Sequence, residues 1–208
     1  INMEAIIDNR EEIDSKLVYE VERNNIKVYK GFTVVNTSGY KRINKVSIMR
    51  LSKDGQKVIG SKINLSCDCL GISGGWTPAV HLFTQSGGKL KFREDDQVFI
   101  PHKYPSDQLS IGSCNGDLSL EEITTNTVLS VKKFLNINNA DYRTFEITTG
   151  INKSKRNIWL LPSDKILGKT KSFVDYQNDA TAKDIKLALR EGFRSIEHVK
   201  RYTTTGMG

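Results

Sequence analysis

The end of the chain, residues 172–208, carries the pattern that most restricts its fold. Thr181 stands before a periodic apolar stretch and is followed three residues later by Asp184, which is the pattern of a capping box at a helix start. The apolar residues then recur at the spacing of one helix face: Ile185, Ala188 and Leu189. Gly192 suits the end of this helix, because glycine adopts the left-handed C-terminal conformation without a Cβ penalty. The segment therefore predicts a capped helix between Thr181 and Gly192.

A second, shorter helix is expected to begin at Ser195, and its end is basic and rich in hydroxyl groups. The residues that give it this character are Lys200, Arg201, Thr203, Thr204 and Thr205. Cations and hydroxyls are hydrogen-bond donors that suit a phosphate. A solvated basic helix end is the alternative, since cations also favour the negative end of the helix dipole.

Three stretches of this segment are similar to a known family: DATAKD (179–184), REGFRS (190–195) and EHVKRYTTTGM (197–207). They resemble the small helical domain of the α subunit of heterotetrameric bacterial sarcosine oxidase. In that family the helical domain links a dinucleotide-binding region to a C-terminal folate-binding domain of the glycine-cleavage T-protein type. The resemblance covers the whole chain but a minority of the α subunit, so we expect an internal fragment of a longer polypeptide.

The resemblance implies an enzyme that oxidises sarcosine to glycine, passes the one-carbon unit to tetrahydrofolate and produces hydrogen peroxide. It implies NAD in the α subunit, FAD in the β subunit, and FMN that is attached to β at the α/β interface. The β, γ and δ subunits would be partners. Lys200 and Arg201 would then neutralise the flavin phosphate or stabilise charge on the reduced ring, with Thr203 and Thr204 donating hydrogen bonds. No amine-oxidising residue is expected in this chain.

Residues 1–135 predict a partial α/β fold of the two-dinucleotide-binding, FAD/NAD(P) type, which gives an α+β chain overall. A strand at 4–8 ends in Asp8, and a helix follows at 11–24, which is half of a βαβ unit. An acid at such a strand end binds a ribose hydroxyl in dinucleotide folds, although a solvated acid is the favoured interpretation here. Further strands are expected at 26–35, 42–51, 57–65, 89–93 and 97–100.

A strand at 65–73 is expected to run into Gly74 and Gly75. In two-dinucleotide folds a strand of this kind returns the chain to the first nucleotide domain, so both glycines are candidate cofactor contacts. Glycine lets the backbone approach a ligand or a neighbouring helix closely. Trp76 is equally well explained by packing at a domain interface, and His81, on a short helix, by a structural role.

Residues 109–135 predict a strand, a glycine turn and a helix. The turn supplies four candidate cofactor contacts: Gly112, Ser113, Asn115 and Gly116. Backbone N–H groups in such a turn point at a phosphate, aided by the helix dipole. Related flavoproteins have Asp where this chain has Ser113. That departure argues against an ordinary flavin site and agrees with NAD binding in the resembled α subunit.

Composition narrows the function classes further. The chain has 31 Lys and Arg against 24 Asp and Glu, but the cations are scattered among acids and no nucleic-acid motif is present. No apolar run reaches membrane-spanning length, so neither a nucleic acid nor a membrane is an expected partner. The three histidines lie far apart in sequence, and no acid–base constellation stands out. Any redox chemistry would therefore belong to a cofactor.

The cysteines indicate a reducing, cytoplasmic location. Cys67 and Cys69 have C-x-C spacing, which is not the C-x-x-C spacing of zinc or redox sites. On a strand both thiols would share one face, where they are expected to be buried like small apolar residues.

The expected organisation is a partial nucleotide region at 1–135, a linker at 136–171 and a helical domain at 172–208. Two alternatives remain for the function. One is a subunit of a related amine or opine dehydrogenase, whose helical domain usually carries cysteines for an iron–sulfur cluster; 172–208 contains none. The other is a non-catalytic scaffold that keeps the nucleotide fold, which Ser113 leaves open.

Overall fold

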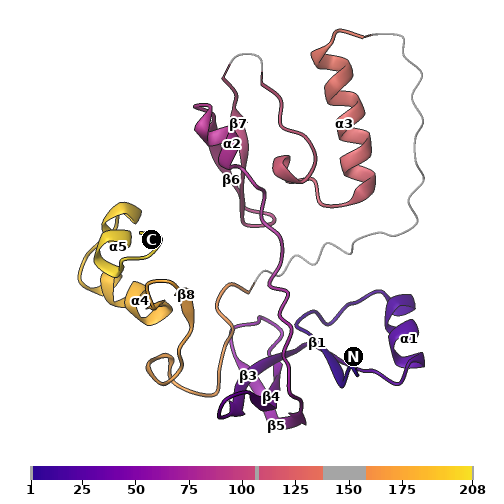
Figure 1. Cartoon of the computed structure of the whole chain (residues 1–208), viewed down its shortest axis with the longest axis vertical. Coiled ribbons are helices and arrows are strands. Elements are labelled where there is room, and N and C mark those ends of the chain that lie inside the picture. The colour runs from indigo at the N-terminus through magenta and orange to yellow at the C-terminus, as the bar shows by residue number, and fades with distance from the viewer. Residues whose placement is uncertain (1, 106–107, 138–157, 208) are drawn as a thin grey trace. The chain divides into compact units, whose positions relative to one another are not determined.

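The computed structural model describes residues 2–105, 108–137 and 158–207, and they form two compact units (Figure 1). One unit contains residues 1–70 together with 158–208, and the other contains 71–157. Both helices and strands are present throughout, so the predicted mixed α/β fold is confirmed.

The first unit begins with a parallel strand pair that is bridged by a helix. Strand β1 (Ala5–Asp8) pairs with β2 (Lys27–Lys30), and α1 (Ser15–Arg23) connects them. The predicted strand at 4–8 and the helix after it are confirmed. The helix starts later than expected because the Asp14 side chain accepts the Lys16 N–H at 2.8 Å, which caps its first turn.

A three-stranded antiparallel sheet follows, in the order β3 (Phe32–Gly39), β4 (Ile43–Leu51) and β5 (Val58–Ser66). The single strand expected at 26–35 is wrong, because Gly31 turns the chain at φ 69° and separates β2 from β3. The hydrophobic core lies on β4, where three side chains are fully buried: Val46, Ile48 and Leu51.

The strand expected at 65–73 is also wrong. The pairing of β5 with β4 ends near Lys45 and Ser66, because β4 begins at Ile43 and offers no further partner. Residues 67–80 have no regular structure. Cys67 packs against the sheet core while Cys69 is exposed, so the two thiols do not share a strand face and are not both buried.

The second unit combines a hairpin with a glycine turn and a long helix. Its elements are α2 (His81–Gln85), β6 (Lys89–Arg93), β7 (Val98–Lys103), the 3-10 helix η1 (Gly112–Asn115) and α3 (Leu120–Phe134). The predicted hairpin and the helices at 81 and 120 are confirmed. The strand expected before the turn is absent: Ile111 is extended, but the structure records no strand pairing there.

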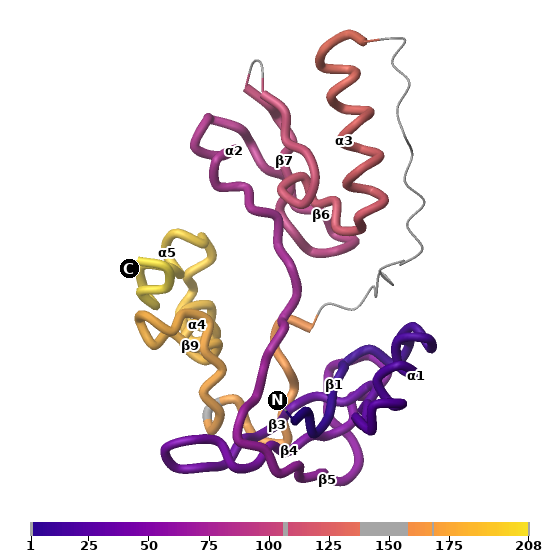
Figure 2. Tube along the Cα trace, turned by 45° about the vertical axis from the view of Figure 1, so that its right-hand side comes forward, coloured from indigo at the N-terminus to yellow at the C-terminus, as the bar shows by residue number. Residues whose placement is uncertain are grey.

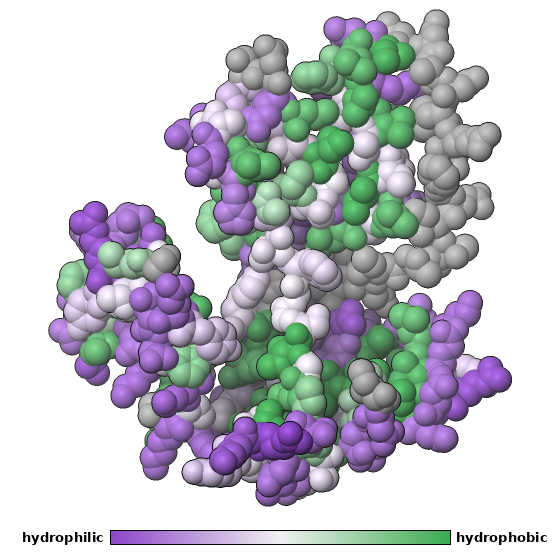
Figure 3. Space-filling model, in the orientation of Figure 1, coloured by the Kyte–Doolittle hydropathy of each residue, from purple (hydrophilic) through white to green (hydrophobic). Residues whose placement is uncertain are grey.

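No side chain of α3 is buried in this unit. Apolar residues lie at its surface, among them Leu120, Leu129 and Phe134, and Figure 3 shows apolar side chains over this helix.

Among the described residues, no helix has the length and apolar character needed to cross a bilayer.

The last part of the first unit holds η2 (Leu167–Lys169), the hairpin β8 (Phe173–Asp175) and β9 (Ala180–Thr181), and the helices α4 (Ala182–Arg190) and α5 (Ile196–Thr203) (Figure 2). Two contacts join the preceding segment to the sheet: Asp164 pairs with Lys62 on β5 at 2.7 Å, and Lys165 donates to Asn36 on β3 at 3.1 Å. The predicted domain limits at 135 and 171 stay predictions, and residues 138–157 of the expected linker lie outside the described residues.

Candidate functional site

The helix pair α4–α5 folds as its local sequence dictates. The Asp184 carboxylate accepts the Thr181 backbone N–H at 2.9 Å and its hydroxyl at 2.6 Å, so the predicted cap at the start of α4 is confirmed. Gly192, at φ 96°, ends the helix; its N–H donates to Leu189, and the next N–H donates to Ala188. These two bonds form a Schellman motif, which redirects the chain into α5.

The basic end of α5 displays its two cations differently. Arg201 is exposed, whereas Lys200 is partly buried and its Nζ lies 3.9 Å from Glu197 Oε1. Both cations lie in the last turn, where the helix dipole favours positive charge. Within the part of the chain that the structure describes, the ion pair of these two cations is the long, solvent-exposed one between Lys200 and Glu197, so an anion that approached this helix end would meet both cations.

The threonines that follow are largely engaged within the unit. Thr203 is buried, and its hydroxyl donates to the Val199 carbonyl at 2.7 Å and contacts the Thr205 hydroxyl at 2.7 Å. Thr204 has a left-handed backbone, φ 58°, and its hydroxyl donates to the Thr203 carbonyl at 2.6 Å. The structure thus turns the Thr203 hydroxyl inward, while the Thr204 side chain remains exposed.

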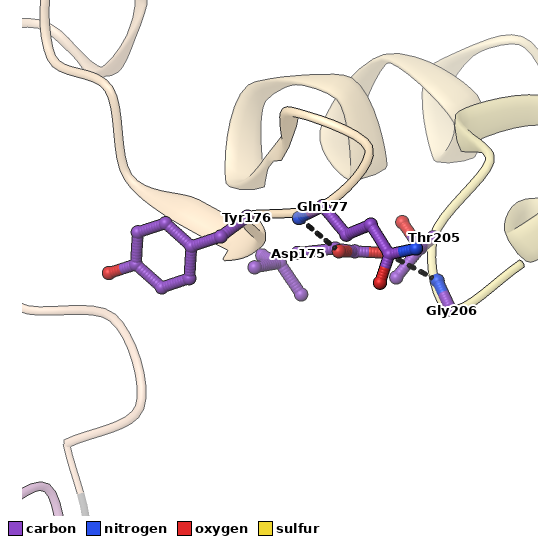
Figure 4. A pocket seen from close by; sticks show the side chains of 6 residues that line it. Asp175, Tyr176, Gln177, Thr205 and Gly206 are labelled. Carbon is purple, nitrogen blue, oxygen red and sulfur yellow. Dashed lines mark hydrogen bonds between the residues drawn. The ribbon is translucent and has the colours of Figure 1, made fainter. Parts of the chain in front are cut away.

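Asp175, at the end of β8, is a residue that the sequence interpretation missed. Its Oδ2 accepts the Gly206 N–H at 2.7 Å, and its Oδ1 accepts the Gln177 N–H at 2.9 Å (Figure 4). Hydrogen bonds from the Asn178 side chain, and then from the Gly206 backbone, lower the pKa of Asp175 to about 2. The Asp-x-x-Asn spacing signals the local turn, but no local pattern indicates the contact to Gly206.

Asp175 and Gly206 line an open hollow between β8 and the chain after α5. The residues that line it are Val174, Asp175, Tyr176, Gln177, Thr205 and Gly206. Tyr176 is exposed and projects from the β8–β9 hairpin, away from Thr205 and Gly206 in the chain after α5 (Figure 4). The hollow lies next to the Lys200 side chain, whose Cε is 3.8 Å from the position that a Gly206 Cβ would take.

In the second unit, the glycine turn uses much of its backbone internally. Gly112 and Gly116 both have positive φ, 69° and 87°. The Gly116 N–H donates to Ser113 O at 3.1 Å, and the Asp117 N–H donates to Gly112 O at 3.2 Å. These two N–H groups are therefore unavailable to a phosphate.

The expected contribution of the α3 dipole to the glycine turn is also missing, because the helix does not begin at the turn. α3 starts four residues after Gly116, and the Ser119 and Glu122 side chains cap it reciprocally at 3.1 and 3.4 Å. The groups that the turn presents are side chains: Ser113 is exposed, and Asn115 Oδ1 accepts the Tyr104 hydroxyl at 3.3 Å.

The hairpin β6–β7 holds this turn in place. Arg93, on β6, donates to the Gly116 carbonyl at 2.8 Å and forms an ion pair with Asp96. A Cβ on Gly116 would lie 2.7 Å from Arg93 Nη2 and 2.9 Å from Ile100 Cγ2. Gly116 is therefore required both for its backbone conformation and for the close approach of the hairpin.

The remaining candidates do not gather into a site within their units. Gly74 and Gly75 are exposed and have open space around them, and Trp76 is 80% exposed. His81 lies at the start of α2 and is exposed. Asp8 pairs with Arg10 at 2.7 Å; its hydrogen bonds to Arg10 outweigh partial burial and lower its pKa.

No metal centre is found in the described ranges, where no three His, Cys, Asp or Glu side chains are arranged to hold an ion. The ten predicted cofactor contacts are thus divided: six lie in the second unit and four in the first. The six are Gly74, Gly75, Gly112, Ser113, Asn115 and Gly116, and the four are Lys200, Arg201, Thr203 and Thr204.

The fold of the chain is similar to part of a solved dehydrogenase structure. The crystal structure of L-proline dehydrogenase from P. horikoshii matches with a TM-score of 0.54 at 16% identity, over 99% of this chain and 40% of that chain. This likeness concerns the fold alone, and it is consistent with a partial dinucleotide-binding region.

Comparison of the sequence identifies the particular relatives. Residues 169–208 match the model of the sarcosine oxidase A3 domain. The chain is 29% identical, over 96% of its length, to sarcosine oxidase subunit alpha of Corynebacterium sp. (strain U-96), and 27% identical, over 83%, to that of Rhizobium meliloti (strain 1021). It spans 21% and 18% of those two proteins. The resemblance to the sarcosine oxidase α subunit that the C-terminal motifs predicted is confirmed.

Proposed function

We propose that this chain is part of the α subunit of an oxidoreductase of the sarcosine oxidase type. The observation that carries the proposal is the similarity to sarcosine oxidase subunit alpha along 96% of the chain, together with the A3-domain match at residues 169–208. The α/β fold supports it as well. The complex is assigned to the cytoplasm, with β, γ and δ subunits as partners.

In this proposal the complex oxidises sarcosine to glycine, transfers the one-carbon unit to tetrahydrofolate and reduces oxygen to hydrogen peroxide. FAD and FMN supply the electron transfer when they are bound. This chain holds no amine-oxidising residue; its role is to contact NAD in the α subunit and to face FMN at the interface with β. FAD and tetrahydrofolate are bound elsewhere in the complex.

The FMN contact is assigned to the basic end of α5. Lys200 and Arg201 are the cations there, and a negative charge on the flavin phosphate or on the reduced ring would be stabilised by them. Thr204 is exposed, and its hydroxyl would exchange its bond to the Thr203 carbonyl for one to the flavin, whereas the Thr203 hydroxyl is buried and bonds the Val199 carbonyl.

The NAD contact is assigned to the glycine turn and to Gly74 and Gly75. Because two N–H groups of the turn bond its own carbonyls, its contribution falls to the exposed Ser113 side chain and to Asn115. Gly74 and Gly75 offer open backbone that a dinucleotide can approach closely.

The test uses the assembled oxidase complex that contains this chain. Sarcosine-dependent oxygen uptake and hydrogen peroxide release are measured with and without tetrahydrofolate, with glycine as the expected product. A complex that oxidises other N-alkyl amino acids but not sarcosine would favour the amine or opine dehydrogenase alternative. NAD is titrated onto the same complex, and absence of binding would favour a nucleotide fold that serves only as a scaffold.

A further inference from the structure

We propose that Asp175 is a positioning residue for the basic end of α5. Its carboxylate holds the backbone after the helix, and that backbone in turn supports the Lys200 side chain. The inference deepens the FMN contact proposed above and rests on it.

The Asp175 carboxylate is held in place by hydrogen bonds from its own turn, in addition to its bond to Gly206. Its Oδ1 accepts the backbone N–H groups of Gln177 and Asn178 at 2.9 and 3.3 Å, and its Oδ2 accepts the Asn178 side-chain amide at 2.9 Å. All three bonds come from the turn between β8 and β9. They hold Oδ2 in the orientation in which it accepts the Gly206 N–H at 2.7 Å.

This last bond joins two segments that are 31 residues apart in the chain. It is charge-assisted, and such bonds are stronger than those between neutral groups. Thr204 and Gly206 both have left-handed backbones, φ 58° and 66°, so the chain turns sharply after α5. The Asp175 bond fixes where that turn ends.

The turn reaches the cation through packing. The Lys200 Cε lies 3.8 Å from the point where a Cβ on Gly206 would stand, so the end of the Lys200 stem is a neighbour of the held backbone. The Lys200 Nζ lies 3.9 Å from Glu197 Oε1. This ion pair is long and exposed, so it restrains the ammonium weakly. The position of the ammonium therefore depends on Gly206, and the position of Gly206 depends on Asp175.

A purely structural role for Asp175 makes a different prediction. In that case its loss lowers the stability of the helix pair but leaves the flavin unchanged in complexes that remain folded. A positioning role changes the flavin in a folded complex, and it does so only while Lys200 is present. The two roles are therefore separated by a double-mutant cycle.

The experiment compares four oxidase complexes: the wild type, Asp175→Asn, Lys200→Ala and the double variant. Asp179→Asn serves as the matched control, because it removes the same charge in the same turn without touching the tail bond. FMN absorbance and the rate of FMN reduction by sarcosine are measured, and circular dichroism verifies that the helices are present. Asp175→Asn is expected to slow FMN reduction by about tenfold, which is less than the ~100-fold that a misplacement of ~1 Å can cost. Asp179→Asn is expected to match the wild type.

In the Lys200→Ala background the Asp175→Asn change is expected to have no further effect on FMN. If the two effects simply multiply, or if Asp175→Asn leaves FMN reduction unchanged in a folded complex, the inference is overturned while the FMN contact stands. If Lys200→Ala itself leaves the flavin unchanged, the FMN contact proposed for this site is the part that fails. Should Asp175→Asn not assemble, Asn178→Ala takes its place in the cycle, because it keeps the carboxylate but removes the side-chain amide that orients Asp175 Oδ2.

Discussion

The glycine turn of the second unit and the basic tail of the first differ in where their polar groups are engaged. At the turn, the Gly116 N–H bonds the carbonyl of Ser113, and α3 is capped by its own Ser119 and Glu122. At the tail, the chain after α5 is held by Asp175, and the cations of the last turn remain at the helix end. The glycine turn uses N–H groups within its own fold, whereas the ion pair that Lys200 forms at the end of α5 is long and exposed to solvent.

The two regions illustrate two kinds of anion-binding site, one made of backbone N–H groups and one made of cationic side chains. A glycine turn needs unpaired backbone N–H groups, and an internal hydrogen bond removes each one that it uses. A cationic helix end needs only that its backbone be fixed by groups other than the cations. In this chain the second condition is met by Asp175 and Thr203.

The largest expected effect comes from Gly116, where the turn meets its hairpin. Gly116→Ala places a Cβ 2.7 Å from Arg93 Nη2 and forces a non-glycine residue to φ 87°. We expect it to lower the free energy of unfolding by about 2–3 kcal/mol, which is the upper range for such backbone strain. Urea unfolding measures the change. Gly74→Ala is the control, since its Cβ meets open space, and an equal loss in both variants would contradict the role assigned to Gly116.

Loss of the helix cap at the start of α4 should lower the free energy of unfolding by a smaller amount. Asp184→Ala removes the acceptor for both the Thr181 N–H and its hydroxyl, and losing a helix cap typically costs about 1 kcal/mol. Thermal unfolding followed by circular dichroism measures it. Lys186→Ala, an exposed change inside the same helix, should be nearly neutral. Equal melting temperatures for Asp184→Ala and the wild type would mean that the cap adds nothing to α4.

Acid should weaken the hydrogen bond between Asp175 and Gly206, because it protonates the Asp175 carboxylate. The pKa of this carboxyl is about 2 in the folded chain against an ordinary value of 3.8, so its stabilising contribution is complete above 3.8 and is lost as the pH falls toward 2. Hydrogen exchange of the Gly206 amide, measured between pH 5 and pH 2 and corrected for intrinsic rates, should show protection that disappears in this window. Asp175→Asn should lack that pH dependence, and a pH-dependent Gly206 amide in this variant would point to another carboxyl.

The smallest expected effect is at Ser113, the position where related flavoproteins have Asp. Its side chain is exposed, so Ser113→Ala should change the free energy of unfolding by less than about 0.5 kcal/mol. Its effect should be seen instead in NAD affinity, measured by titration calorimetry on the complex. Unchanged affinity would remove Ser113 from the proposed NAD contact.

The sequence predicted best what local chemistry determines. The capping pattern of Thr181 and Asp184, the terminal Gly192 and the start of α5 at Ser195 each depend on residues within a few positions, and all are confirmed. The hairpin at β6–β7 is also local. These elements need no distant partner to be specified.

What was missed depends on distant partners. The strand expected at 65–73 fails because β4 ends its pairing there, and periodicity cannot reveal where a neighbouring strand begins. The glycine turn is a local exception: the direction of its N–H groups depends on the 3-10 geometry between Gly112 and Asn115, which the glycine spacing alone does not specify. The bond from Asp175 to Gly206 spans 31 residues, which is beyond the reach of any local pattern.

The central claim is that the basic end of α5, and not the glycine turn, contacts the flavin. The most direct measurement is the midpoint potential of FMN in the assembled oxidase, compared between Lys200→Ala/Arg201→Ala and Ser113→Ala/Asn115→Ala. Cations near the ring stabilise its reduced, negatively charged form, so removing both should lower the potential and slow FMN reduction, while the glycine-turn variant keeps the wild-type potential. An unchanged potential in the Lys200→Ala/Arg201→Ala complex, or an equal shift in both variants, would contradict the claim.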